Sequence, residues 1–376
     1  MQDVKNKTTT VFDALDSVLR KKLVMAVYRL PGESDVSLLI QKDPELMELK
    51  NLSQIPESGG FLISPFSAEE EKSKIYLIKP EILLRNYVSE SQIEQIQKIR
   101  PAFLNGFEKN NLQETDKEDF ITQVRHTIKQ IETGSYDKVV LSRVKLIRGN
   151  YSADIVKIFS LLCESNANAF VYMFHFNGTC WMGATPEPLI CAAKEQLFTV
   201  SLAGTRPYSE ENTHVENWNH KERVEQEYVT QYIEKILTDY KVTHYTKKGP
   251  YTKQAGKLLH LRTDFFFNGE TIGDKLPALI NALHPTSAVC GIPMEQSLHL
   301  IRSLEKHDRE YYSGYLGPVG LDKGMQLFVN LRCMKVLENQ LVLYVGGGIT
   351  SESVPEEEWE ETEIKADTLL SIVQQI

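Results

Sequence analysis

Two predicted helices each begin with a pair of glutamates three residues apart, Glu222 with Glu225 and Glu358 with Glu361. At 100° per residue, the second glutamate of each pair lies on the helix face that carries apolar residues. A carboxylate buried there alone is strongly destabilising, so it needs a cation or several hydrogen-bond donors. Four inward carboxylates without a histidine or cysteine cluster indicate a hard cation, Mg²⁺ rather than zinc. The alternative is two acidic, solvated first turns that favour the helix dipole.

Lys138 and Glu187 are the candidates for proton transfer. Lys138 is the first residue of the predicted strand 138–146. A lysine at the end of a strand is ordinarily a surface residue whose amine reaches solvent. In a buried site it could act as a base in its neutral form. Glu187 lies between two prolines just after a predicted strand. It is either exposed in a turn or a general acid that an apolar pocket keeps protonated.

Other residues could hold an anion. Glycine-containing stretches at 203–206, 314–320 and 346–348 could bring backbone amides close to a ligand, although each is also compatible with a tight turn. None has the spacing of an ATP- or NAD-binding loop. Arg332 lies in an otherwise apolar predicted strand, where a buried arginine usually binds a carboxylate or phosphate. His284 could bind a ligand or be a core histidine.

Composition restricts the class of protein. The chain has 376 residues, 41% of them hydrophobic and 25% charged, which is typical of a globular protein. No apolar run is long enough for a membrane helix, and the polar first residues lack a secretory signal, which predicts a cytoplasmic protein without a membrane partner. The net charge of −9 without a basic cluster disfavours nucleic acid. Five scattered cysteines predict reduced thiols rather than disulfides or zinc.

The elements that must position these residues follow from periodicity and turn signals. Strands and helices alternate without a strict βαβ order, which predicts an α+β fold. We expect three segments: an N-terminal α/β part of the fold over 1–104, a polar connection over 105–115 and a core over 116–376. The individual elements are expected as strands at 23–30, 37–40, 138–146, 170–176, 179–182, 327–337 and 340–345, and as helices at 91–99, 222–239, from Thr115 (its N-cap) to about Gly134, and from about Pro355 onward.

From about Thr115 to the C-terminus the sequence resembles the chorismate-utilising enzymes, which include isochorismate, salicylate, anthranilate and aminodeoxychorismate synthases. The matching motifs run in the family's order: DKVVLSR (137–143), GATPEPL (183–189), LAGTR (202–206), KERVE (221–225), HL (260–261), ALHPTSAVCGIP (282–293), EKHDREYYSGYLGPVG (305–320), LRC (331–333), YVGGGI (344–349) and EEEWEETEIK (356–365). The resemblance implies two large packed β-sheets flanked by helices, with the active site between the sheets.

By motif position, the resemblance also implies a role for each site residue. Glu225 and Glu361 would bind Mg²⁺, with Glu222 and Glu358 held close to it. Lys138 would activate water, and Glu187 would be the acid. The substrate-binding residues would be Ala203, Gly204, Thr205, His284, Arg332, Gly346, Gly347, Gly348 and Lys365.

Two positions select the reaction. Lys138 stands where isochorismate- and salicylate-forming members carry their lysine, whereas members that use ammonia typically carry glutamine. Ala203 stands where aminodeoxychorismate synthases carry a nucleophilic lysine. The resemblance therefore favours a Mg²⁺-dependent isochorismate synthase acting on chorismate, a monomer or homodimer, with menaquinone as the expected pathway. A salicylate synthase and an isochorismate synthase for catechol siderophores are the alternatives.

Overall fold

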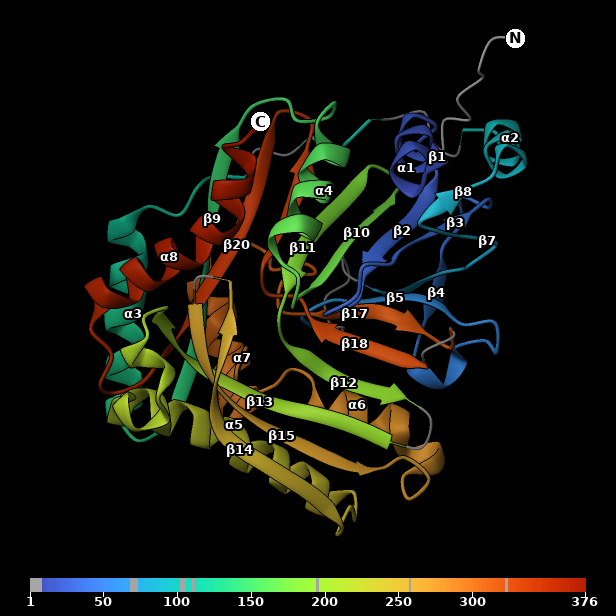
Figure 1. Cartoon of the computed structure of the whole chain (residues 1–376). Helices are drawn as coiled ribbons and strands as arrows, with labels where there is room; N and C mark the ends of the chain where they lie inside the picture. The colour runs from blue at the N-terminus through green and yellow to red at the C-terminus, as the bar shows by residue number, and fades with distance from the viewer. Residues whose placement is uncertain are drawn as a thin grey trace.

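The computed structural model describes residues 9–67, 74–101, 106–109, 112–193, 196–256, 258–321 and 324–376. The other residues, among them 105, 110 and 111 of the expected connection, lie outside the described part. The described residues form two antiparallel sheets with helices on their outer sides (Figure 1). The prediction of an α+β fold with two large packed sheets is confirmed.

The larger sheet has 11 strands. In spatial order they are β1 (Thr9–Thr10), β8 (Tyr87–Val88), β7 (Ile82–Arg85), β3 (Val36–Gln41), β2 (Val24–Arg29), β10 (Phe170–Phe176), β11 (Thr179–Thr185), β19 (Cys333–Leu337), β20 (Gln340–Ile349), β9 (Lys138–Arg148) and β16 (Gly291–Ile292).

The smaller sheet has nine strands. In spatial order they are β14 (Tyr245–Ala255), β15 (Leu258–Asn268), β13 (Gln196–Pro207), β12 (Pro188–Ala193), β18 (Met325–Val329), β17 (Tyr315–Val319), β5 (Gly60–Ser64), β6 (Ile75–Ile78) and β4 (Met47–Leu49). Strands from the first 104 residues therefore lie in both sheets.

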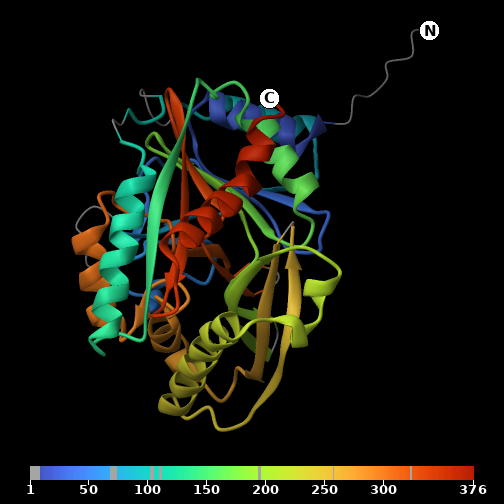
Figure 2. The ribbon, with the colours of Figure 1, turned by 90° about the vertical axis from the view of Figure 1, so that its left-hand side faces the viewer.

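The α-helices of the described part are α1 (Val11–Arg20), α2 (Glu90–Lys98), α3 (Lys117–Glu132), α4 (Ile155–Ser165), α5 (His220–Asp239), α6 (Leu276–Leu283), α7 (Met294–Leu304) and α8 (Pro355–Val373). Helix α8 lies across strands of the larger sheet, and α5 packs on the smaller sheet (Figure 2). No helix in the described residues is long and apolar enough to cross a membrane.

Side-chain alternation along β10 shows how the core is divided. Phe170, Tyr172 and Phe174 belong to an aromatic-rich cluster that includes residues of both sheets. Val171 and Met173 belong to a second cluster, which includes residues of α1, α4 and α8. Since successive side chains of a strand point to opposite faces, the continuous apolar run is explained by burial of both faces of this sheet.

One expected element was wrong. The stretch 327–337 does not form one strand, because the chain passes from β18 in the smaller sheet to β19 in the larger sheet. Asn330 fixes this passage: its side chain donates to the Tyr311 carbonyl oxygen over 2.8 Å and accepts from the Tyr172 hydroxyl over 2.5 Å. Arg332 therefore lies in the connection between the sheets. Apolar periodicity carries no signal for a change of sheet.

A smaller correction concerns the start of α3. Asp116, and not Thr115, is the N-cap, and its side chain accepts from the Asp119 amide over 2.8 Å. The backbone amide of Thr115 instead donates to the Val144 carbonyl oxygen over 3.2 Å. The end of the polar connection is thereby held against β9.

A buried ion pair fastens the strand that carries Lys138. The Arg309 guanidinium contacts both carboxylate oxygens of Glu305, at 2.5 and 2.8 Å, and both side chains are almost fully buried. Arg309 also donates to the carbonyl oxygens of Val140 and Val289, and Glu305 accepts from the Ser142 amide. The pair therefore joins β9 to two other parts of the chain.

We expect Glu305→Gln to lower the free energy of unfolding by about 3–5 kcal/mol, because it leaves the Arg309 charge buried without its carboxylate. Urea unfolding followed by circular dichroism measures this change. The control is Glu48→Gln, which removes the exposed Glu48–Lys74 pair and should change stability by less than about 1 kcal/mol. Equal effects of the two substitutions would contradict a special role for the buried pair.

Candidate active site

A small cavity between the sheets brings most of the predicted residues together. We call it the inner cavity; it has a volume of about 60 Å³. Strands β9 and β20 of the larger sheet, β13 and β15 of the smaller sheet, and helices α5 and α8 all contribute to it. Its lining residues are Val140, Pro186, Glu187, Leu202, Ala203, Gly204, Thr205, Glu225, His260, Ala288, Val289, Tyr312, Ser313, Leu331, Arg332, Gly346, Gly347, Gly348 and Lys365.

Glu187 lies in the link between β11 and β12, with only 4% of its surface exposed. Its carbonyl oxygen accepts from the Val329 amide over 2.9 Å, which holds the link against β18. Burial raises the pKa of the Glu187 carboxyl to about 7, although Arg332, Lys138, Arg262 and Lys365 all oppose the shift. Glu187 is therefore a buried carboxyl that can donate a proton near neutral pH.

Lys138 is completely buried at the start of β9. Its Nζ atom lies 3.0 Å from Oε1 of Glu225 on α5. A Cβ atom on Gly348 would lie 2.7 Å from Lys138 Cε and 2.6 Å from that Glu225 oxygen, so only glycine leaves room for the pair. Lys138 is not among the described residues that line the inner cavity; it lies directly behind Glu225 and Gly348.

Two cations of the inner cavity can bind an anion. Lys365 donates to Glu361 over 2.6 Å and to the Gly346 carbonyl oxygen over 2.9 Å. The backbone carbonyl oxygen of Arg332 accepts from the Ala184 amide over 2.8 Å, but its guanidinium has no hydrogen bond or salt bridge to any residue in the described part of the chain. A guanidinium that lines a cavity without a carboxylate partner is suited to bind a ligand carboxylate in a bidentate manner.

The stretch 203–205 passes close to α5. Gly204 has φ +71°, and a Cβ atom there would lie 3.0 Å from Cβ of Glu222 and 3.3 Å from the Trp218 ring. Both the backbone conformation and the space therefore require glycine. The Gly204 carbonyl oxygen accepts from Nδ1 of His260 over 2.9 Å.

His260 is a site residue that we did not single out from the sequence. Burial, followed by the charge of Arg332, lowers the pKa of its imidazole to about 3, so the ring is neutral. Because Nδ1 donates to Gly204, the buried Nε2 atom is left as an acceptor, and it has no hydrogen-bond partner among the described residues. The motif HL at 260–261 was the available signal, but one histidine in a predicted strand has no distinctive spacing.

Each of the four predicted carboxylates contacts a cationic side chain in this structure. Glu358 is the most deeply buried, with 1% of its side chain exposed, and the others are 16–27% exposed. The pairs are Glu225 with Lys138, Glu361 with Lys365, Glu358 with Lys221, and Glu222 with Arg206. The prediction that these residues point inward agrees with their burial.

The donor chemistry of this cluster fits a hard cation. Oε2 of Glu358 is buried and has no hydrogen-bond partner in the described residues. A Cβ atom added to Gly347 would lie 3.2 Å from this oxygen and 3.9 Å from Oε1 of Glu361. Burial and then the charge of Glu361 raise the pKa of Glu358. Burial lowers the pKa of Lys221, but the charges of Glu358, Glu361 and Glu225 outweigh this effect, so that its pKa is raised. The negative charges of the three carboxylates therefore all act on Lys221.

The described side chains do not form a ready metal site. In the ranges that the structure describes, no three histidine, cysteine, aspartate or glutamate residues are grouped closely enough to hold a metal ion. The carboxylates are instead each drawn to a lysine or arginine. A bound cation would therefore have to replace some of these contacts.

His284 lies apart from the other predicted substrate-binding residues. Its ring packs against Tyr315, with ring centroids 4.8 Å apart, and burial lowers its pKa to about 4. It is not among the described lining residues of the inner cavity. This position matches the core-histidine alternative.

The inner cavity is lined by a proton donor and an unpaired guanidinium, and the buried amine of Lys138 contacts Glu225 of its wall. Glu187 can protonate a leaving group, Lys138 can act as a base in its neutral form, and Arg332 with Lys365 can neutralise an anion. Such a site suits acid–base chemistry on a small anionic molecule.

Comparison with known proteins agrees with this chemistry. A family model described as chorismate binding enzyme matches residues 67–374. The vibriobactin-specific isochorismate synthase of Vibrio cholerae is 30% identical over 283 residues, which cover 72% of this chain and 71% of that protein. The isochorismate synthase EntC of Escherichia coli K12 is 32% identical over 249 residues, or 64% of this chain and 63% of that protein.

A solved structure shows the same fold. The menaquinone-specific isochorismate synthase MenF of Escherichia coli superposes with a TM-score of 0.74 at 22% identity, covering 96% of this chain and 91% of that chain.

Proposed function

The chain belongs to the chorismate-binding enzymes, and we propose that it is an isochorismate synthase, which converts chorismate reversibly into isochorismate. The observation that carries the proposal is the buried carboxyl of Glu187 at the wall of the inner cavity, whose pKa is about 7, together with the buried amine of Lys138, whose charge acts on that carboxyl and which contacts Glu225 of the same wall. The relatives named above as isochorismate synthases support it.

In the proposed reaction, a water molecule replaces a hydroxyl group of the ring. Lys138, as the neutral amine, accepts a proton from the water that attacks C2. Glu187, in its protonated form, donates a proton to the C4 hydroxyl as it leaves, and the ring double bonds shift. Water enters and water leaves, so the substrate and product are isomers. The reaction requires Glu187 to carry its proton while the amine of Lys138 is neutral at the same pH. The distinct environments of paired catalysts allow this.

The substrate carboxylates require cations and backbone donors. We assign Arg332 and Lys365 to them, because both line the inner cavity and Arg332 has no salt bridge in the described residues. The backbone at 203–205 and 346–348 lines the same cavity, and we assign it to contacts with the ring. The role of His284 in substrate binding stays a prediction that its position does not favour.

We further propose that Glu225 and Glu361 bind Mg²⁺, with Glu358 and Glu222 held close to it. The partnerless oxygen of Glu358 and the concentrated negative charge support this donor set. A cation held by these residues would supply positive charge that stabilises a dianionic substrate beside the glutamates.

We expect Glu361→Gln to weaken Mg²⁺ binding by about tenfold or more, because it removes one charged oxygen ligand. Isothermal titration with MgCl₂ and the Mg²⁺ dependence of the initial rate both report this change. The matched control is Glu360→Gln on the same helix, where Glu360 contacts only the exposed Lys117 in the described structure. An unchanged affinity in Glu361→Gln would remove this residue from the metal site.

The assay that tests the function is direct. Purified protein is incubated with chorismate and MgCl₂, the products are separated by liquid chromatography, and pyruvate is measured with lactate dehydrogenase. We expect isochorismate without stoichiometric pyruvate. Release of salicylate with an equal amount of pyruvate would instead identify a salicylate synthase, the alternative that shares the same acid, base and carboxylates. No conversion of chorismate would contradict both.

We also propose a biosynthetic pathway and a cellular location for the enzyme. The names of the relatives include both vibriobactin-specific and menaquinone-specific enzymes, and the menaquinone pathway remains our prediction. All five cysteines are free thiols, which fits the reducing cytoplasm that we propose as its location. Whether the enzyme is a monomer or a homodimer can be measured by light scattering.

A further inference from the structure

The inner cavity has two larger spaces beside it. Beside it lies a chamber of about 240 Å³, to which Pro186, His260 and Arg332 also contribute. Beyond this side chamber lies an outer cavity of about 550 Å³, which shares Asn168 and Pro186 with it. Pro186, next to the proposed acid, lines all three spaces. The three spaces therefore adjoin one another at Pro186, beside Glu187.

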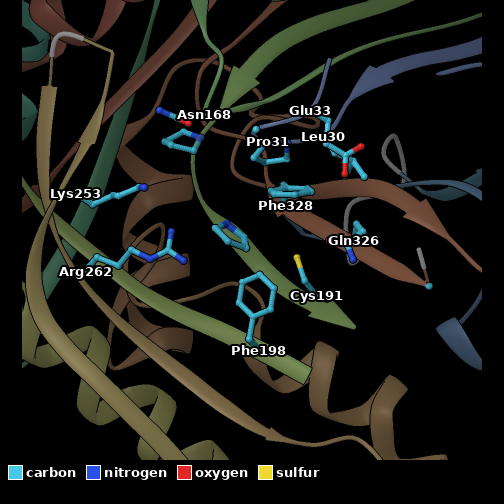
Figure 3. Close-up of a pocket in the computed structure, with 14 residues that line it drawn as sticks. Leu30, Pro31, Glu33, Asn168, Cys191, Phe198, Lys253, Arg262, Gln326 and Phe328 are labelled. Atoms are coloured by element: carbon cyan, nitrogen blue, oxygen red, sulfur yellow. The ribbon is translucent and has the colours of Figure 1, made fainter. Parts of the chain in front are cut away.

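The outer cavity is too large to be a gap in packing, and its walls are mixed. Phe198 and Phe328 provide apolar walls, while Lys253 of β14 and Arg262 of β15 extend their side chains into it (Figure 3). Ligand pockets of roughly 300–1,000 Å³ with a few convergent polar groups are the usual size for small molecules. The outer cavity can hold a molecule on its way to the inner cavity.

The two cations differ in how far they are neutralised. Arg262 contacts Asp264, with Nε 2.7 Å from Oδ1. Lys253 has no salt-bridge partner in the described residues, and it is exposed at the wall of the cavity. It also lies directly opposite His260 in the β14–β15 register, on the same face of the sheet. Its charge is thus placed between the outer cavity and the wall of the inner cavity.

We propose that chorismate reaches the active site through these adjoining cavities, and that Lys253 attracts the substrate into them. This inference rests on the proposed function, because it requires a substrate with two carboxylates. A cation at the mouth of a cleft raises the local concentration of an anion and its association rate, and salt weakens the effect. Lys253 is not among the described residues that line the inner cavity, so its proposed role is to guide the substrate and not to take part in catalysis.

The test measures the association rate constant of chorismate by stopped-flow tryptophan fluorescence, together with steady-state turnover. We expect Lys253→Glu to slow association about fivefold at ~10 mM salt and by less than about twofold at ~1 M salt, because screening removes the attraction. The kcat at saturating chorismate should stay close to that of the wild type. The control is Lys235→Glu on α5, an exposed lysine outside the three cavities, which should change neither rate.

A second variant tests the route itself. Asn168 is exposed and lines both the outer cavity and the side chamber, so Asn168→Trp should obstruct the passage and slow association about fivefold or more at every salt concentration. Glu164→Trp, exposed but outside these cavities, is its control. Unchanged association rates in both Lys253→Glu and Asn168→Trp, with a wild type that turns over chorismate, would overturn the passage alone. A wild type that does not convert chorismate would overturn the proposed function and the passage with it.

Discussion

Lys138→Ala should lower kcat for the formation of isochorismate by about 100-fold or more, the usual contribution of a positioned general base. The amine is completely buried, and its one salt bridge in the described structure is to Glu225. Alanine removes the proton acceptor without adding a group that could replace it. The rate is measured with saturating chorismate and MgCl₂ by liquid chromatography.

The matched control for this prediction is Lys145→Ala. Lys145 lies on the same strand, but its side chain contacts Glu363 of α8 at 2.5 Å and does not line the inner cavity. We expect this variant to retain near-normal turnover. If Lys138→Ala also retained it, Lys138 would have no part in the reaction.

Glu187→Gln should lower kcat by a similar factor, about 100-fold or more, because an amide cannot supply the proton that the leaving hydroxyl needs. The pKa of about 7 adds a pH dependence. Glu187 must be protonated to act, so its active fraction is high below pH 7 and falls about tenfold per unit above it. The rate of the wild type should therefore decline as the pH rises above about 7.

A pH–rate profile of both proteins separates catalysis from folding. The decline above about pH 7 should be present in the wild type and absent from the residual activity of Glu187→Gln, whose side chain does not titrate. A decline that persists unchanged in the variant would show that another group causes it.

Local patterns predicted the direction of the acidic side chains but not their partners. Helical periodicity places Glu225 and Glu361 on the apolar faces of their helices. In the structure Glu225 lines the inner cavity, whereas Glu361 is 27% exposed and Glu358 is the most deeply buried of the four. The contact of Glu225 with Lys138, however, joins positions 87 residues apart. Such a contact depends on how α5 and β9 are brought together by the two sheets, and no local pattern encodes it.

The same limit explains the less successful expectations. The run 327–337 reads as one apolar strand because burial in either sheet selects the same residue types, and Asn330, which fixes the crossing, is a single polar residue within it. His284 and His260 are both buried histidines whose sequence contexts do not separate a core position from a cavity wall. The mixed order of strands and helices predicted the α+β class, and the family motifs, which occur in a fixed order between residues 137 and 365, supplied the arrangement of two packed sheets.

The source of the new hydroxyl group is the most direct test of the proposed reaction. Chorismate is incubated with the enzyme and MgCl₂ in water enriched in oxygen-18, and isochorismate is analysed by mass spectrometry after brief turnover. Attack of water at C2 predicts one oxygen-18 atom in each newly formed isochorismate molecule. Isochorismate that forms without the label would show that the hydroxyl group migrates within the substrate, which would contradict the roles assigned to Lys138 and Glu187.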